Sequence, residues 1–183
     1  MVKKRSSEDF TSDNILLTSL KKFFKIKTNL NSFLRIYNKK SKISLRLLDW
    51  FVTNYSKKHN ISYFIKKRNA RKYFLVYEEY KSQLKAYSKK RFDPFCRRHR
   101  ITFTISKDEE IITTIGQLNF FKWAIENKVL NYVTKHLEKV ETDMNVSIKT
   151  HYKKKNTKTR KPLSICATKQ IRKHNVKIIV NFD

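Results

Sequence analysis

The chain has 183 residues, which is enough for one domain with a buried core. Lys and Arg total 43 against 15 Asp and Glu, so the net charge of +28 calls for an anionic partner. The sequence has no secretory apolar segment and no run near the ~20 apolar residues of a membrane span, and its two cysteines lie far apart. A reduced, soluble, intracellular setting without a cleavable targeting signal is therefore expected.

The N-terminal part is predicted to hold a basic and polar tail over residues 1–12 and then two core-facing helices. Apolar side chains recur at helical spacing over residues 13–26, opposite lysines, and again over 42–58. These apolar positions are Leu16, Leu20, Phe23, Phe24, Ile43, Leu47, Trp50, Phe51 and Tyr55. The alternative for the first segment is a helix that lies on an anionic membrane surface.

Strand patterns follow in the middle of the chain. Residues 61–65 and 73–77 suit a hairpin whose loop, 66–72, carries five positive charges. Residues 101–105 alternate apolar and Thr side chains and predict another strand, with a candidate partner strand at 176–182.

The strongest helical pattern covers residues 115–144. Thr114 and Gln117 have the spacing of a capping box, in which the two side chains reciprocally bind free backbone N–H groups, and Asn127 is a candidate break between two helices. Residues 107–145 hold 5 basic and 7 acidic side chains within an otherwise basic chain. We expect helix 115–144 either to pack in the core or to dock a protein partner.

The C-terminal part is predicted to be a basic extension. Residues 150–161 contain no aliphatic side chain, so 150–162 reads as a linker that is disordered until neutralised. The segment 163–183 follows and ends in the strand 176–182. The predicted fold class is α+β: a helix-rich single domain, residues 13–149, with a small antiparallel sheet and basic flexible extensions.

Aromatic and basic residues interleave between positions 63 and 100. Cations neutralise phosphates and exposed rings stack on bases, so this mixture suits single strands or RNA loops. The alternative is that the rings belong to the core, because Tyr77, Tyr80, Leu84 and Tyr87 fall on one helical face.

Residues 91–100 contain a turn with a proline and five arginine or histidine side chains. A guanidinium binds phosphate with two donors at once, so these arginines are candidates for a defined phosphate grip. Alternatively, Asp93 pairs with a neighbouring Arg and the turn only joins two elements. The predicted nucleic-acid-binding residues are Lys66, Lys67, Arg68, Arg71, Lys72, Lys89, Lys90, Arg91, Arg97, Arg98, Arg100, Lys153, Lys154, Lys155, Lys158, Arg160 and Lys161.

No catalytic constellation is visible in the sequence. Cys96 and His99 have a spacing that occurs in zinc sites, but a structural site needs four ligands and only Cys166 and scattered histidines remain. The acidic residues 78–79 and 108–110 are adjacent in sequence, which is typical of a solvated surface. Glycine-rich phosphate loops and metalloprotease motifs are absent. We predict a protein without enzyme activity, metal or cofactor.

Several phrases of the sequence are distinctive together: ISLRLLDWFVTNY (43–55), FDPFCR (92–97), TTIGQLNFFKWAIE (113–126), and the tail LSICATK (163–169) leading to VKIIVNFD (176–183). They resemble an uncharacterised family of small basic proteins from nucleocytoplasmic large DNA viruses such as the mimivirus group. The resemblance covers about residues 42–183 and carries over no functional residue. It implies a setting, either the viral factory in the host cytoplasm or the virion.

Two hypotheses follow. The leading one is a non-enzymatic accessory or virion protein that binds the phosphate backbone of DNA or RNA with low sequence specificity and strong salt dependence. The alternative is a structural minor capsid or scaffold protein whose basic arms contact acidic protein surfaces, with residues 107–145 as its main docking face.

Overall fold

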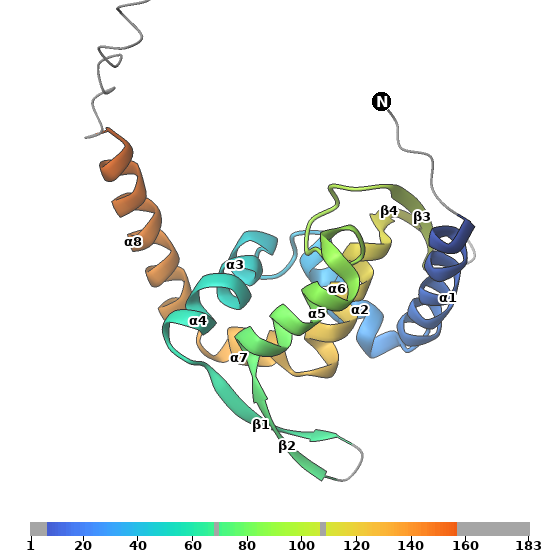
Figure 1. The fold of residues 1–183 in the computed structure, drawn as a ribbon, viewed down its shortest axis with the longest axis horizontal. Coiled ribbons are helices and arrows are strands. Elements are labelled where there is room, and N and C mark those ends of the chain that lie inside the picture. The colour runs from blue at the N-terminus through green and yellow to red at the C-terminus, as the bar shows by residue number, and fades with distance from the viewer. Residues whose placement is uncertain (1–6, 68–69, 107–108, 157–183) are drawn as a thin grey trace, which may run out of the picture. The chain divides into compact units, whose positions relative to one another are not determined.

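The computed structural model describes residues 7–67, 70–106 and 109–156, and its elements confirm a helix-rich α+β fold (Figure 1). The helical elements are α1 (Ser7–Phe24), α2 (Lys27–Tyr37), α3 (Leu45–Trp50), the π-helical turn η1 (Phe51–Tyr55), α4 (Ser56–Lys58), α5 (Val76–Arg91), α6 (Ile115–Glu126), α7 (Val129–Lys135) and α8 (Leu137–Asn156). The strands form two antiparallel pairs: β1 (Ser62–Lys67) with β2 (Ala70–Leu75), and β3 (Arg100–Thr104) with β4 (Glu110–Thr114). The chain divides into two units, Met1–Val146 and Ser147–Asp183, and the account below concerns the first.

The first two helices pack through aromatic and aliphatic side chains at helical spacing. Leu20 and Phe24 of α1 are buried, as the sequence predicted, although α1 begins at Ser7, inside the predicted tail. Helix α2 was not predicted. It buries Phe33 and Ile36, three residues apart on one face, and it begins after Ile26 without a side-chain cap. Because the sequence shows no capping residue before Lys27, the start of this helix was not recognised.

The predicted helix over 42–58 is present as a continuous helical stretch made of α3, η1 and α4. The Ser44 hydroxyl accepts from the Leu47 N–H at 3.1 Å and caps its start. The π-helical turn inserts a residue into the 3.6-residue repeat. Phe51 and Val52 are both fully buried as a result, and Tyr55 and Ser56 continue the same face.

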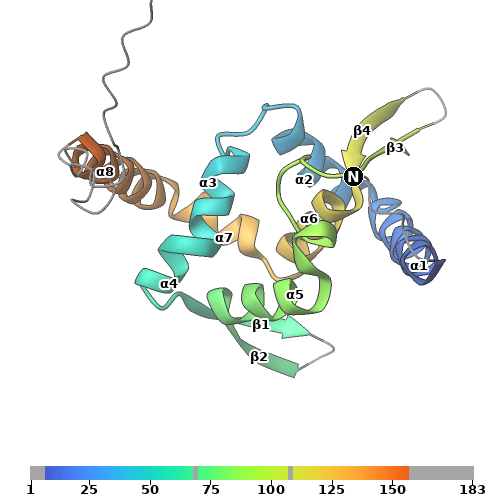
Figure 2. The same cartoon turned by 45° about the horizontal axis from the view of Figure 1, so that its top comes forward.

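Helix α6 is the centre of the core. Its residues from Gly116 to Phe121, together with Trp123 and Ala124, are buried, and a helix that is buried on all sides needs neighbours on all sides. On one side Trp123 packs on Phe92, with ring centroids 5.6 Å apart. On another, Phe121 packs on Phe33 at 4.9 Å. Figure 2 shows α6 running between α2 and α5.

The start of α6 confirms one half of the predicted capping box. The Thr114 hydroxyl accepts from the Gln117 N–H at 3.0 Å. The prediction of the reciprocal bond is wrong. The Gln117 side chain instead accepts a hydrogen bond from the Thr113 hydroxyl and donates one to the Pro94 carbonyl, both at 2.9 Å. Gln117 is 1% exposed, so its amide satisfies one buried polar group of β4 and one of the 92–95 turn instead of the helix end.

The predicted helix 115–144 is divided at two places. Asn127 ends α6, as the sequence suggested, and Lys128 adopts a left-handed conformation with φ 59°. A second break at His136, which was not predicted, separates α7 from α8. Beyond it α8 continues to Asn156, past the start of the predicted linker at 150, because no Gly or Pro interrupts residues 117–161.

One strand prediction needs correction, and another strand has a partner that was not predicted. The first hairpin pairs from Ser62↔Leu75 to Lys67↔Ala70, so most of the predicted loop 66–72 is strand. Buried Ile65 and Phe74 hold this ladder against the helices. Strand β3 pairs with β4, which the sequence did not reveal, and the turn between them is closed by Ile105 N–H donating to the Glu109 carbonyl at 2.8 Å. The predicted partner 176–182 lies outside the described residues. Across the described part of the chain, no helix is long and apolar enough to cross a membrane.

Candidate nucleic-acid interface

The β1–β2 hairpin has an inner face that fastens it to the helices. Tyr63 stacks on Tyr132 of α7 with ring centroids 5.2 Å apart and 14° between the planes. Its hydroxyl donates to the Asn127 carbonyl at 2.9 Å. Burial raises the pKa of Tyr63 well above its usual value, and the adjacent Tyr132 adds to this effect. Tyr63 therefore serves as a neutral structural anchor, and with buried Phe74 it fixes which face of the hairpin points outward.

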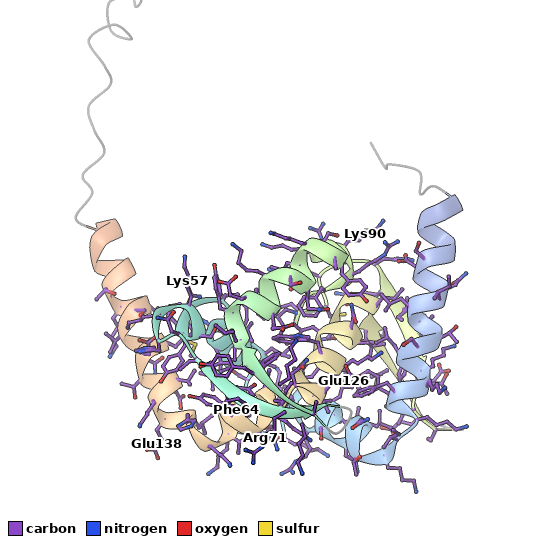
Figure 3. The ribbon with its side chains drawn as sticks, turned by 60° about the horizontal axis from the view of Figure 1, so that its bottom comes forward. Lys57, Phe64, Arg71, Lys90, Glu126 and Glu138 are labelled. Atoms are coloured by element: carbon purple, nitrogen blue, oxygen red, sulfur yellow. The ribbon has the colours of Figure 1, made fainter. Side chains whose placement is uncertain are left out.

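The opposite face, here called the outer face, consists of Ser62, Phe64, Lys66, Arg71, Tyr73 and Leu75. These residues share one face because side chains alternate along a strand and Phe64 lies directly opposite Tyr73. Phe64 is 68% exposed and Tyr73 is 51% exposed, with ring centroids 5.3 Å apart. Figure 3 shows Phe64 and Arg71 on this hairpin. Two neighbouring aromatic rings are thus presented to solvent on a short ribbon.

The cations of the outer face lie beside these rings. Lys66 is directly opposite Arg71 in the ladder, and both are exposed. Like charges in directly opposed positions destabilise a hairpin, so this pair is more stable when an anion lies between the two side chains. Lys72 belongs to the inner face and pairs with Glu79 of α5 at 2.6 Å. Of the predicted basic loop, Lys66 and Arg71 therefore come together, whereas the Lys67 side chain and Arg68 lie outside what the structure describes.

The position of the rings on the hairpin is supported by a side-chain hydrogen bond. The Ser62 and Tyr73 hydroxyls lie 2.5 Å apart and hold the Tyr73 ring along the outer face. Of the other aromatic residues between 63 and 100, Phe74, Tyr80 and Phe92 are buried. The interleaved aromatic pattern thus contains both kinds of ring that the sequence analysis considered, and the outer face holds the exposed ones.

The basic residues after α5 have mixed surroundings. Ser88 interrupts the helix with φ 55°, so Lys89 and Lys90 sit beyond a kink and are exposed. Arg91 is not a freely presented arginine: its Nε donates to the Asp13 carboxylate at 2.6 Å, and its side chain is 22% exposed. This ion pair ties the end of α5 to α1.

The 91–100 segment follows the structural alternative at one of its arginines. The Arg97 guanidinium donates twice to the Asp93 carboxylate, at 2.8 and 3.0 Å, and lies over the Phe95 ring. This hydrogen bonding raises the pKa of Arg97. Arg97 is nevertheless 61% exposed, and Arg98 and Arg100 are exposed. The turn therefore joins two elements and also presents arginines.

A half-buried acidic group, Asp49, interacts electrostatically with this turn. Burial raises the pKa of Asp49, and the negative charge of Asp93 adds to the shift. Burial, followed by the same two carboxylates, raises the pKa of Tyr80 to about 12. Among the described residues, no group of three or more His, Cys, Asp or Glu side chains is placed to hold a metal ion. Arg97 is therefore bonded to Asp93 and lies within the electrostatic influence of Asp49 in α3.

The predicted basic tail is only partly visible. Lys153, Lys154 and Lys155 belong to α8, although their side chains are not among those described, and Lys158, Arg160 and Lys161 lie outside the described residues. The buried side chains of α6 form the core, which is one of the two roles predicted for helix 115–144. One set of cations was not predicted as a site, and it gathers around a cavity: Arg35, Lys40, Lys42, Lys135 and Lys139.

Comparison with known proteins gives the chain a family but no activity. An uncharacterized protein, L507, of Acanthamoeba polyphaga mimivirus is 44% identical over 171 residues, and the match covers 89% of this chain and 66% of that protein. The chain thus spans less than two thirds of the relative's length, and the viral origin of that relative agrees with the resemblance to the mimivirus group. No solved structure matches. The model of a family of unknown function, DUF7197, matches residues 1–183, so the chain belongs to this family.

Proposed function

We propose that this protein binds single-stranded nucleic acid without catalysis, and that the outer face of the β1–β2 hairpin is its contact surface. The observation that carries the proposal is the pair of exposed rings, Phe64 and Tyr73, beside the opposed cations Lys66 and Arg71. Unpaired bases stack on exposed rings, and cations alongside neutralise the phosphates. The exposed Arg98 and Arg100 and the net charge of +28 favour the same kind of partner.

The outer face favours single strands over duplex. In a duplex the base faces are already stacked on each other, so exposed rings have little to gain there. Readout by stacking tolerates every base, and the outer face offers few hydrogen-bonding groups that distinguish base edges. The binding should therefore be weakly sequence-selective. We propose a viral factory or a virion as the setting of this role, as an accessory to DNA or RNA, and the viral origin of the relative supports that setting.

The test is fluorescence anisotropy with a labelled oligothymidylate, the matching oligouridylate and a duplex of the same length. We expect the single strands to bind more tightly than the duplex, with affinity falling as salt rises. Affinity that stays micromolar or weaker at low salt, or that does not respond to salt, would exclude nucleic-acid binding.

Variants of the two rings distinguish stacking on bases from non-specific hydrophobic binding. Phe64→Leu with Tyr73→Leu keeps an apolar surface but removes both π faces, and it should lower the affinity for single strands roughly tenfold or more. Tyr73→Phe keeps the ring and loses only the Ser62 contact, so it should bind nearly as the parent does. Ile112→Ala removes an exposed aliphatic side chain of β4, 59% exposed, and serves as the matched control. Unchanged binding by the double Leu variant would rule out the hairpin as the stacking surface.

Variants of the cations test the phosphate contacts. Lys66→Gln with Arg71→Gln should reduce the slope of log affinity against log salt by roughly 1.4, since each phosphate contact on a single strand contributes about 0.7. Lys21→Gln with Lys22→Gln removes the same net charge from exposed positions of α1 and should change the slope little. A protein that elutes free of nucleic acid and co-sediments with empty viral particles would instead support the structural role.

A further inference from the structure

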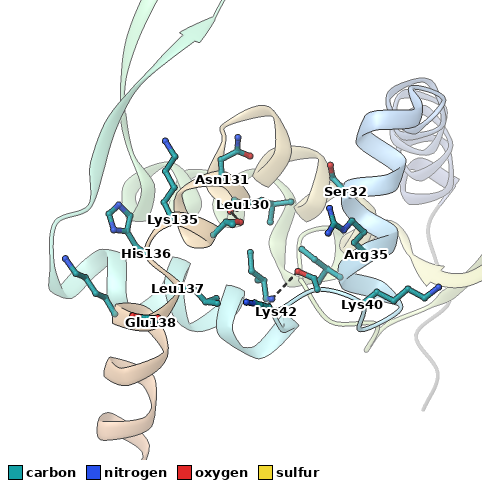
Figure 4. A pocket seen from close by; sticks show the side chains of 15 residues that line it. Ser32, Arg35, Lys40, Lys42, Leu130, Asn131, Lys135, His136, Leu137 and Glu138 are labelled. Carbon is teal, nitrogen blue, oxygen red and sulfur yellow. Dashed lines mark hydrogen bonds between the residues drawn. The ribbon is translucent and has the colours of Figure 1, made fainter.

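A cavity of about 890 Å³ lies between α2, the loop that leads to α3, α7 and the start of α8 (Figure 4). Ligand pockets for small molecules occupy roughly 300–1,000 Å³, so this volume suits a compact ligand. Its charged lining consists of Arg35, Lys40, Lys42, Lys135, Lys139 and one carboxylate, Glu138. Five positive charges against one negative leave an excess of four within one concave surface.

Helix ends account for only part of this charge. Arg35 lies in the last turn of α2 and Lys135 in the last turn of α7, where cations are favoured by the partial negative charge of a helix C-terminus. Lys42 lies in a loop, and Lys139 lies in the first turn of α8, where the helix dipole disfavours a cation. Lys42 and Lys139 therefore have no local helical reason to be basic.

The cavity cations are also not neutralised by the protein. None of the ion pairs found among the described residues involves a cavity cation; they join other side chains, such as Lys58 to Asp143 and Lys72 to Glu79. Glu138 is one carboxylate among five cations. An anionic ligand would supply the missing charge.

The Ser and Thr hydroxyls in the cavity have partners within their own elements. The Ser32 and Thr134 hydroxyls donate to carbonyls of α2 and α7 at 2.8 Å, and the Ser41 hydroxyl accepts from the Ile43 N–H at 3.1 Å. The donors that face a ligand are therefore chiefly ammonium and guanidinium groups, with the Ser41 hydroxyl and the side chains of Asn131 and His136 as further donors. Oxyanions are the acceptors that such a donor set prefers.

We propose that this cavity binds a compact ligand with two or more linked phosphates, such as a nucleoside triphosphate or inorganic polyphosphate. The buried aliphatic side chains of Ile36, Ile43 and Leu130 also line the cavity and offer an apolar floor to a base or sugar. Linked phosphates bring several negative charges within the reach of four or five cations. The site goes beyond nucleic-acid binding and uses none of the residues of the hairpin's outer face.

The test is isothermal titration of the full chain with inorganic tripolyphosphate and, separately, with adenosine triphosphate. Lys42→Gln with Lys139→Gln removes two of the three cations that the helix ends do not explain, Lys40 of the same loop being the third, and it should weaken tripolyphosphate binding about tenfold or more. Arg35→Gln is a second, independent variant with the same expected direction. Lys21→Gln with Lys22→Gln is the charge-matched control and should change the affinity by less than about twofold.

Each outcome bears on the proposal. Tighter binding of adenosine triphosphate supports a nucleotide, and equal binding supports a phosphate chain alone. An equal loss in the cavity variant and the control would overturn the proposal, because binding would then depend on net charge. Displacement of tripolyphosphate by oligothymidylate, with an equal loss of oligonucleotide binding in the cavity variant, would make the cavity part of the nucleic-acid surface and also overturn it. Tripolyphosphate binding should survive Phe64→Leu with Tyr73→Leu, so failure of either site is recognised separately.

Discussion

Asp143 connects α8 to the helical stretch over residues 45–58. Replacing Asp143 would test which of its contacts stabilises that connection. The Trp50 indole Nε1 donates to the Asp143 carboxylate at 3.0 Å, and the Lys58 ammonium contacts the same carboxylate. The Asp143 side chain is 10% exposed, whereas Lys58 is 60% exposed. A hydrogen bond to a charged group contributes about 1.5–3 kcal/mol, and an exposed ion pair about 0–1 kcal/mol. The indole bond is therefore the stronger contact.

Asp143→Ala should lower the free energy of unfolding by about 2 kcal/mol, because it removes both contacts and leaves the indole N–H without its acceptor. Asp143→Asn should lower it by less than about 1 kcal/mol, since the amide oxygen still accepts from Trp50. Urea denaturation followed by tryptophan fluorescence and circular dichroism measures both values. Equal losses in the two variants would refute the reasoning, because the charge would then carry the stability.

The parent protein and Asp143→Asn also test how the stability depends on pH. Burial acts to raise the pKa of Asp143, but hydrogen bonds from Lys58 and Trp50 outweigh burial and hold the pKa below its usual value. A carboxyl whose pKa is lowered by folding contributes stability above about pH 4 and loses it as the pH falls through the lowered pKa. The stability difference between the parent and Asp143→Asn should therefore vanish in strong acid. A difference that persists there would mean that the charge of Asp143 does not cause it.

Two further replacements test the packing around the start of α6. Gly116→Ala should lower the free energy of unfolding by roughly 1 kcal/mol, because its Cβ would lie 3.2 Å from the Lys90 carbonyl oxygen and 3.3 Å from the Phe92 nitrogen, both backbone atoms, and overpacking there exceeds the gain in helix propensity. A stabilised variant in urea denaturation would contradict this. Gln117→Leu should cost about 2–4 kcal/mol, because it leaves the Pro94 carbonyl and the Thr113 hydroxyl unpaired in the core. A loss below about 1 kcal/mol in calorimetry would show that the turn relaxes to reach solvent.

Periodicity in the sequence predicted the helices that bury one face and the hairpin that alternates. It also predicted the break at Asn127 and the cap at Thr114. It missed α2, which starts without a capping side chain, and β4, which pairs with β3 alone within the described part of the chain. Pairing between strands depends on tertiary contacts, so a short strand such as β4 carries little signal of its own.

The sequence showed that aromatic and basic residues are mixed in the candidate interface, but it did not show which of them share an exposed face. Alternation shows that Tyr63 and Phe64 point in opposite directions, but only the position of Tyr132 in α7 decides which of them is buried. The pairing of Arg91 with Asp13 is equally a property of the fold, because these residues are 78 positions apart. The cavity cations range from position 35 to position 139 and share no local pattern that could have been recognised.

The burial of α6 on all sides has a consequence for the order in which the chain can fold. Phe33 packs on Phe24 and Phe92 packs on Tyr80, but each ring also packs on a ring of α6, which begins only at Ile115. During synthesis, the first 114 residues leave the ribosome before the helix that completes their packing. We therefore expect the packing of both aromatic clusters to stay incomplete in the nascent chain until α6 emerges. The two clusters should then complete their packing together in one cooperative step.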